Sequence, residues 1–133
     1  MWSLLVTYPS GFRLWISECG FHVIKEFNSG HYFEAHEHLE EALDEVAADI
    51  DAWELFVGLL QVAVGYHKYA SGYRGGEKMF DLGLEKMSSL PNGCAGVRLA
   101  ELRQRVQEDL ANSDGVKERL RREPPRIMLL SAK

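Results

Sequence analysis

Residues 52–70 read AWELFVGLLQVAVGYHKYA, and this stretch decides the fold. From Leu55 to Tyr66 its only strongly polar residue is Gln61. A helix that is apolar on nearly all sides is buried on nearly all sides, so the stretch predicts a core helix that other helices surround. No segment shows the alternation of apolar and polar residues that is typical of a strand. We therefore expect an all-α fold, a single-domain bundle of about five or six helices over residues 1–133.

One face of this core helix carries small and polar residues. Gly58, Gln61 and Gly65 align on it, because residues three, four and seven apart share a helix face. Each glycine costs the helix roughly 1 kcal/mol relative to alanine, and we expect a neighbouring backbone to approach closely in return. An unpaired buried amide costs roughly 1–3 kcal/mol, so Gln61 needs hydrogen-bond partners. We expect these to be His36 and Glu40 on the preceding helix.

That preceding helix is predicted at about 32–48. Its apolar stripe is formed by Tyr32, Leu39, Leu43, Val46 and Ile50. The opposite side should be solvated and consists of Glu34, His38, Glu41 and Glu45. His36 and Glu40 are four residues apart and stack on one face, at the edge of the apolar stripe. The sequence therefore predicts a solvated carboxylate face and, separately, a His36–Glu40 pair at the core boundary.

The remaining elements follow from apolar spacing and turn chemistry. We expect helices at about 12–27 with a possible break at Gly20, and at about 77–90, 97–110 and 116–122. Asn28-Ser29-Gly30 reads as a turn, and Asp51 as the N-cap of the core helix. Residues 1–10 read as an irregular lead-in. After two prolines, residues 124–133 are predicted to form an extended tail that packs back on the bundle.

Composition limits the classes of partner. The 133-residue chain has a formal net charge of −5, which argues against nucleic acid and anionic membranes, since both need a basic footprint. No apolar run is long enough for a transmembrane helix. Cys19 and Cys94 form no CxxC motif, so a reduced cytoplasmic location is expected. The remaining partners are a second copy of the chain, as a homodimer, or another protein.

Two blocks of the sequence resemble a known family. Residues 27–40 contain Phe, Asn, a small residue and Gly, followed by Tyr-x-Glu-x-His-Glu-x-x-Glu. This pattern resembles the signature of a small all-helical family catalogued as domain of unknown function 309. Residues 58–63, with the glycines at 72, 75 and 76, are similar to that family's Gly-Leu-Ile-Gln-x-Ala helix and glycine-containing turn. The resemblance covers about residues 21–90, although Leu43 and Asp44 stand where the family usually carries tryptophan.

The resemblance implies a bundle of about five or six helices and no established reaction. The resemblance implies that the motif positions of the family correspond in this chain to Glu34, His36, Glu37, Glu40 and Gln61. One interpretation of this polar cluster is a divalent-metal site, because residues 36–40 read His-Glu-x-x-Glu, a variant of the HExxH zinc helix. His36 and Glu40 would then bind the metal, with Glu34, Gln61 or His67 as a third ligand. Glu37 would stand where the general base of a hydrolase stands.

The alternatives to a metal site stay open. His36 would hydrogen-bond Glu40 or Gln61 in a purely structural network. The domain would otherwise act as a binding or interaction module, since small bundles with aromatic edges commonly bind a partner. The only basic cluster is formed by Arg119, Arg121, Arg122 and Arg126. It reads as a solvated face, or as contacts to an anionic ligand or to the acidic face of the 32–48 helix.

Overall fold

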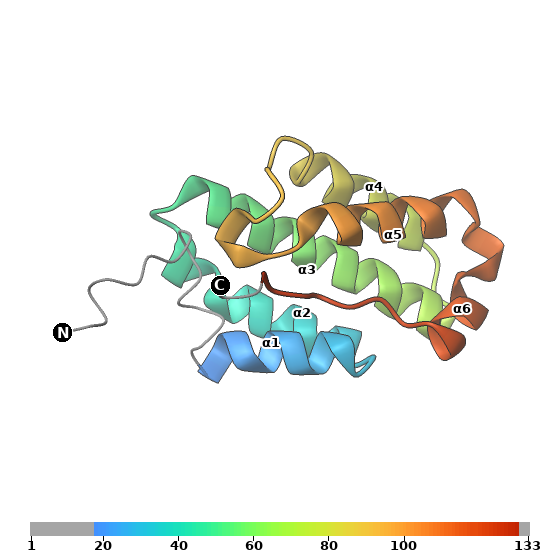
Figure 1. Ribbon diagram of the computed structural model, residues 1–133. Coiled ribbons are helices and arrows are strands. Elements are labelled where there is room, and N and C mark those ends of the chain that lie inside the picture. Colours follow the sequence, from blue (N-terminus) through green and yellow to red (C-terminus); the bar gives the residue numbers. More distant parts are fainter. Residues whose placement is uncertain (1–17, 131–133) are drawn as a thin grey trace.

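The computed structural model describes residues 18–130 of the chain, and six α-helices account for most of them (Figure 1). These are α1 (Glu18–Asn28), α2 (Tyr32–Ala42), α3 (Ile50–Ser71), α4 (Gly76–Lys86), α5 (Leu99–Ala111) and α6 (Val116–Arg122). Three short 3₁₀ turns, η3 (Leu43–Val46), η4 (Cys94–Gly96) and η5 (Ser113–Gly115), extend or connect them. Within residues 18–130 no β-strand forms, and one isolated antiparallel bridge joins Val97 to Leu129. The predicted all-α bundle of five or six helices is confirmed.

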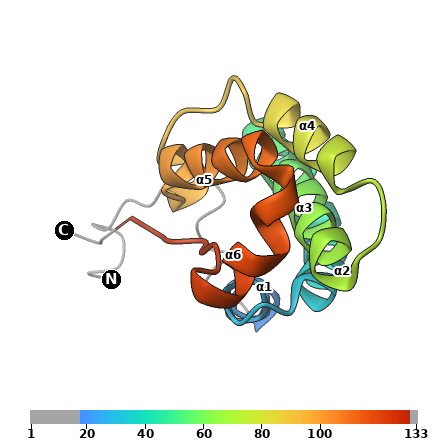
Figure 2. The same cartoon turned by 90° about the vertical axis from the view of Figure 1, so that its right-hand side faces the viewer.

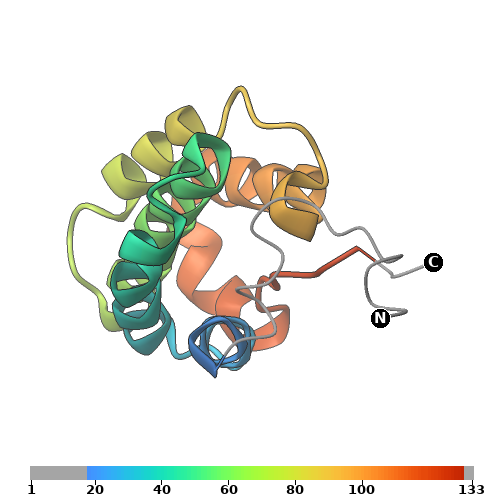
Figure 3. The ribbon, with the colours of Figure 1, turned by 90° about the vertical axis from the view of Figure 1, so that its left-hand side faces the viewer.

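The helices form an open arc when viewed along their axes (Figures 2 and 3). Helices α1, α2, α3 and α4 follow one another around the arc, and α5 lies beyond α4. The chain after α6 crosses the open side between α5 and α1 (Figure 1). Figure 1 also shows α3 in the middle of the bundle, as the apolar composition of residues 52–70 predicted.

Helix α3 is the core element, and its ends explain its length. Its buried residues are Ala52, Leu55, Phe56, Gly58, Leu59, Val62, Ala63, Gly65 and Tyr66. The helix begins at Ile50 because the Asp49 side chain accepts a hydrogen bond from the backbone N–H of Ala52 at 3.1 Å. The predicted N-cap, Asp51, is therefore wrong by two residues. Gly72 ends the helix with a left-handed backbone (φ 74°), which glycine adopts without strain.

Helices α3 and α4 pack through two glycine pairs. Gly58 faces Gly83, and Gly65 faces Gly76, so the glycines are seven residues apart in each helix and the pairs keep one antiparallel register. A Cβ added at Gly83 would lie 3.0 Å from the carbonyl oxygen of Gly58. A Cβ added at Gly65 would lie 2.6 Å from the Phe80 ring. The predicted close approach of a neighbouring backbone is confirmed, but the neighbour is α4 and not α2.

Two further boundaries differ from prediction. Gly20 is buried within α1 and does not break it. Helix α2 ends at Ala42 and continues as a single 3₁₀ turn, so the predicted helix at 32–48 is an α-helix followed by a tighter segment. Ile50, which was predicted to lie on the apolar stripe of this helix, is instead the first residue of α3 and is 72% exposed. The expected lead-in at residues 1–10 lies outside the described residues. Of the helices in the described part of the chain, none is long and apolar enough to cross a membrane.

The C-terminal segment confirms the predicted extended tail as far as Leu130. Residues 124–130 run along the open side of the arc (Figure 1). Ile127 is almost fully buried, with 2% of its surface exposed. Its backbone is hydrogen-bonded to the Asn28 side chain at the end of α1. The tail therefore joins the first helix to the far end of the arc.

Candidate functional site

The predicted site residues of α2 lie mostly in solvent. Glu34, Glu37 and Glu40 are exposed, and His36 is half-buried. Packing of α2 buries only Tyr32, Ala35, Leu39 and Ala42, so the core boundary passes through His36 and leaves Glu40 outside. The prediction was right for His36 and wrong for Glu40.

The predicted hydrogen bond between His36 and Gln61 does not form. His36 Nδ1 lies 3.3 Å from the carbonyl oxygen of Phe33 in the preceding turn. Gln61 points away from α2, because its glycine stripe packs on α4. It lies in a hollow lined also by Glu54, Leu82, Glu85, Lys86 and Ser89. Its Oε1 atom is buried and has no hydrogen-bond partner among the described residues.

The metal-site candidates are His36 and Glu40, with Glu34, Gln61 or His67 as a third ligand. No group of three or more His, Cys, Asp or Glu side chains is placed to hold one metal ion within residues 18–130. The His36–Glu40 pair thus remains a two-residue candidate, and Glu37 beside it is a solvated carboxylate.

An aromatic groove lies where α2, α3 and the loop after α3 meet. It encloses about 280 Å³ and is lined by Phe33, His36, Val64, His67, Lys68 and Tyr73. The Phe33 ring centroid lies 5.4 Å from that of His36 and 5.2 Å from that of His67. Phe33 is 45% exposed and Tyr73 is 64% exposed. Large rings that stay open to solvent around a hollow are typical of a contact surface.

The charge of the chain is concentrated beside this groove. From Glu26 to His67 the sequence holds ten carboxylates and no lysine or arginine. Six of the carboxylates are exposed along α2 and η3 and form what we call the acidic face: Glu34, Glu37, Glu40, Glu41, Asp44 and Glu45. Among the ion pairs of the described residues, only Glu41 takes part from this set, with His38 Nδ1 at 3.3 Å. Like charges four residues apart destabilise a helix by roughly 0.2–0.5 kcal/mol per pair, so the acidic face lowers the stability of α2.

The acidic face and the groove are adjacent on α2. Glu37 lies one helical turn after Phe33, and Glu40 lies one turn after His36. A single ligand can therefore contact an aromatic ring and a carboxylate at the same time. The predicted solvated carboxylate face is confirmed for Glu34, Glu41 and Glu45, whereas His38 is half-buried. The exposed carboxylates also include Glu37, Glu40 and Asp44, which that prediction had not assigned to the face.

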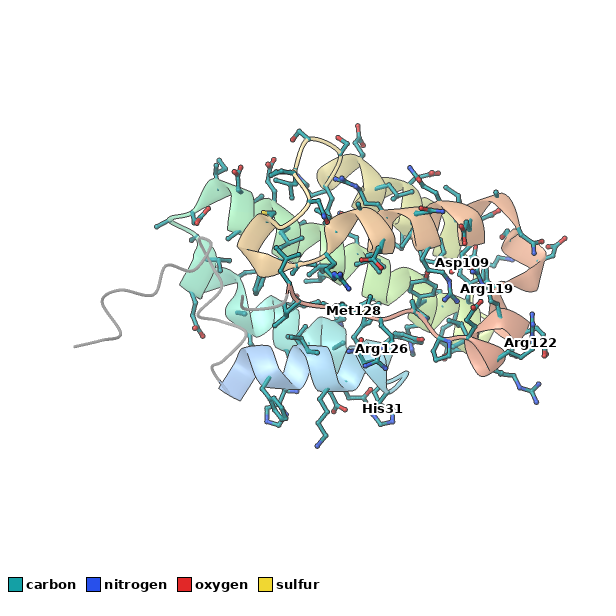
Figure 4. The ribbon with its side chains drawn as sticks, in the orientation of Figure 1. His31, Asp109, Arg119, Arg122, Arg126 and Met128 are labelled. Atoms are coloured by element: carbon teal, nitrogen blue, oxygen red, sulfur yellow. The ribbon has the colours of Figure 1, made fainter. Side chains whose placement is uncertain are left out.

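A second polar centre, which the sequence analysis missed, is buried around Asp109. Asp109 is 1% exposed and is the only charged residue among the buried side chains of the described chain. Its carboxylate accepts hydrogen bonds from Tyr66 Oη at 2.5 Å, Arg105 Nε at 2.8 Å and Arg119 Nη1 at 3.1 Å. Burial, followed by the negative charge of Asp109, raises the pKa of Tyr66 far above its ordinary range, so its hydroxyl remains a donor. Figure 4 shows Asp109 and Arg119 side by side between α5 and α6.

This centre ties three helices together. Arg119 also pairs with Glu108 at 3.0 Å and with Glu123, the residue after α6, at 3.2 Å. Its positive charge is therefore balanced by carboxylates of α5 and of the end of α6. Arg121 and Arg122 lie 3.6 Å from Glu118. Arg121 and Arg122 are 77% and 68% exposed, as expected for a solvated face. The alternative, that the cluster contacts the acidic face of the 32–48 helix, is wrong for Arg119, Arg121 and Arg122, whose described partners all lie on α5, on α6 or just after it. Because its charges are paired with one another, we interpret the Asp109 centre as structural.

Comparison with known families supports the resemblance seen in the sequence. The model of the family described as domain of unknown function (DUF309) matches residues 21–79. Over these residues the chain is similar to the DUF309 family. The matched region contains the acidic face and every residue of the groove, whereas Asp109 and the tail lie after it. Among curated proteins, no sequence matches this chain. DUF309 carries no assigned activity in its description, so the function has to be inferred from the site.

Proposed function

We propose that this domain is a protein-interaction module that binds a basic segment of a partner protein. The observation that carries the proposal is an open aromatic groove directly beside six exposed carboxylates. An apolar side chain of the partner enters the groove, and flanking arginine or lysine residues contact the acidic face.

The size of the groove supports an anchor side chain. Sites for drug-sized ligands usually enclose about 300–1,000 Å³, and a volume of about 280 Å³ suits one large side chain. Lys68 forms part of the wall, so a cation inside the groove would be repelled and an apolar group is favoured. The cationic groups of the partner then lie outside the groove, next to Glu37 and Glu40, which follow Phe33 and His36 by one turn.

The chemistry favours arginine over lysine at these flanking positions. A guanidinium binds a carboxylate through two parallel hydrogen bonds and stacks on an aromatic face. The carboxylates of Glu37 and Glu40, which are exposed outside the groove, can accept such paired hydrogen bonds. The concentrated negative charge also attracts a basic partner over distances of about 10 Å at 0.1 M salt, which raises the association rate.

Selection from a library of random peptides, each long enough to form about four turns of a helix, tests the proposal. We expect the enriched peptides to combine an aromatic or aliphatic anchor with flanking arginine or lysine. Their binding should weaken in Phe33→Ala and in Glu37→Gln/Glu40→Gln. The control is Glu101→Gln/Glu118→Gln, which removes two exposed carboxylates of α5 and α6. Enriched peptides without a basic excess, or peptides that bind all variants equally, would contradict the proposal.

A further inference from the structure

The side chain of Asn28 forms a two-point clamp on the backbone of the tail. Asn28 Nδ2 donates to the carbonyl oxygen of Ile127 at 3.1 Å, and the N–H of Ile127 donates to Asn28 Oδ1 at 2.7 Å. A side-chain amide carries one acceptor and one donor group in the same arrangement as a neighbouring strand. The clamp therefore binds the peptide backbone of Ile127, and its two hydrogen bonds do not depend on which side chain stands at that position.

The opposite edge of the tail is bound as well. The N–H of Arg98 donates to the carbonyl oxygen of Met128 at 2.8 Å, and the N–H of Leu130 donates to the carbonyl oxygen of Gly96 at 2.7 Å. These two bonds form the antiparallel bridge between Val97 and Leu129. The tail is thus held as an extended segment, with Asn28 on one edge and residues 96–98 on the other.

The side chains of the tail alternate between the core and solvent. Pro125 and Ile127 are buried and Leu129 packs partly buried against the core, whereas Arg126 and Leu130 are exposed and Met128 is half-buried. Figure 4 labels Arg126 and Met128 on this segment, between α5 and α1. The slot therefore takes apolar residues at every second position, as expected when an extended peptide is added at a strand-like edge.

The clamp and the tail belong to different parts of the chain. Asn28 lies inside the region that matches the DUF309 model, residues 21–79, whereas residues 96–98 and the tail at 124–130 both lie after it. We propose that the slot between Asn28 and residues 96–98 is a binding site for an extended peptide with a proline-x-aliphatic-x-aliphatic pattern, and that the C-terminal tail occupies it in cis. A partner protein that presents such a segment displaces the tail. This inference is independent of the acidic face and its basic partner.

The test uses the full chain with a protease site inserted between Glu123 and Pro124. The protein is folded first and cleaved afterwards, so the tail peptide starts in its slot. We expect a labelled synthetic peptide of residues 124–133 to exchange into the slot with one-to-one stoichiometry, measured by fluorescence anisotropy. N-methylation at Ile127, which removes the N–H that Asn28 binds, should weaken binding at least tenfold. The control is N-methylation at Leu129, whose N–H donates to no described residue.

Failure of the peptide to exchange, or equal binding of the peptide methylated at Ile127, would overturn the proposal. Hydrogen exchange on the uncleaved chain gives a second test that does not depend on the cut protein staying folded. The amides of Ile127 and Leu130 should exchange faster than those of α3, and Asn28→Ala should accelerate the tail amides alone. Ser29→Ala, at an exposed neighbour, should change neither. Exchange of tail and α3 only together would show that the tail does not open separately, and would also overturn the proposal.

Discussion

Replacing Asp109 with alanine should cost more stability than any surface substitution, because the Asp109 carboxylate joins three helices. It accepts hydrogen bonds from Tyr66 on α3, Arg105 on α5 and Arg119 on α6. In Asp109→Ala these donors lose their shared acceptor inside the bundle. The penalty then depends on how well each donor can reach water or another acceptor.

The exposure of each donor sets the magnitude. Arg119 is 28% exposed and keeps Glu108 and Glu123, so it contributes little to the loss. Arg105 is only 12% exposed, and its Nη2 already lacks a partner among the described residues. Leaving one partner of a buried ion pair uncompensated costs about 3–5 kcal/mol. Asp109→Asn keeps one oxygen as the acceptor for the Tyr66 hydroxyl, but it removes the charge and replaces the second acceptor with an N–H donor. We expect a smaller loss of about 1–3 kcal/mol.

Urea unfolding, followed by circular dichroism, measures these losses. With a denaturant slope of about 2 kcal/mol/M, Asp109→Ala should lower the midpoint by roughly 2 M. The double variant Asp109→Leu/Arg105→Met should be more stable than Asp109→Ala, because no unpaired charge remains. A loss below about 1 kcal/mol in Asp109→Ala, or a double variant less stable than the single one, would refute the reasoning.

Three further predictions concern other parts of the bundle. Gly83→Ala should destabilise the fold by about 1–3 kcal/mol in the same urea assay, because its Cβ would press on the Gly58 carbonyl oxygen, while Glu85→Ala serves as the exposed control. The hydrogen bond that His31 Nδ1 donates to the Glu26 carboxylate raises the pKa of His31. The stabilisation by this pair is therefore present below the unfolded-state pKa and is lost as pH rises through the folded-state pKa; NMR titration should show a lower His31 pKa in Glu26→Gln. If residues 36–40 bound a divalent cation, a hundredfold excess over Kd would stabilise the fold by about 2.7 kcal/mol; we expect zinc and manganese titrations to leave the melting temperature unchanged, and a rise that Glu40→Gln removes would favour the metal site.

Much of the fold follows from apolar periodicity. The largely apolar stretch of residues 55–66 identified the core helix, and the predicted helix at 116–122 matches the bounds of α6. These features depend on local spacing, which the sequence contains in full. The N-cap of α3 was misplaced because Asp49 and Asp51 are both acceptable caps, and only the backbone geometry distinguishes them.

The neighbour that a helix face contacts cannot be predicted from that helix alone. The helical period correctly placed Gly58, Gln61 and Gly65 on one face of the core helix, but it does not identify the helix that packs against that face. The matching pair in α4, Gly76 and Gly83, has the same spacing of seven residues. Comparing these spacings would have directed Gln61 to α4 and away from His36.

The Asp109 centre was missed for a related reason. Asp109 follows Leu102 by seven residues and Val106 by three, so it lies on the apolar stripe of α5. A carboxylate at such a position requires buried partners, and Arg105 is one turn away. The other two partners come from residues 43 positions before it and 10 after it, which no local pattern connects.

The most direct test of the proposed function is the dissociation constant of a selected basic peptide for the unmodified domain and for Glu37→Gln/Glu40→Gln. Exposed ion pairs contribute about 0.2–1 kcal/mol each, so losing two should weaken binding by about 2- to 30-fold at low salt. The difference should shrink at about 1 M salt, where charges are screened beyond about 3 Å. Equal dissociation constants at low salt would show that the acidic face takes no part in binding, and would contradict the account.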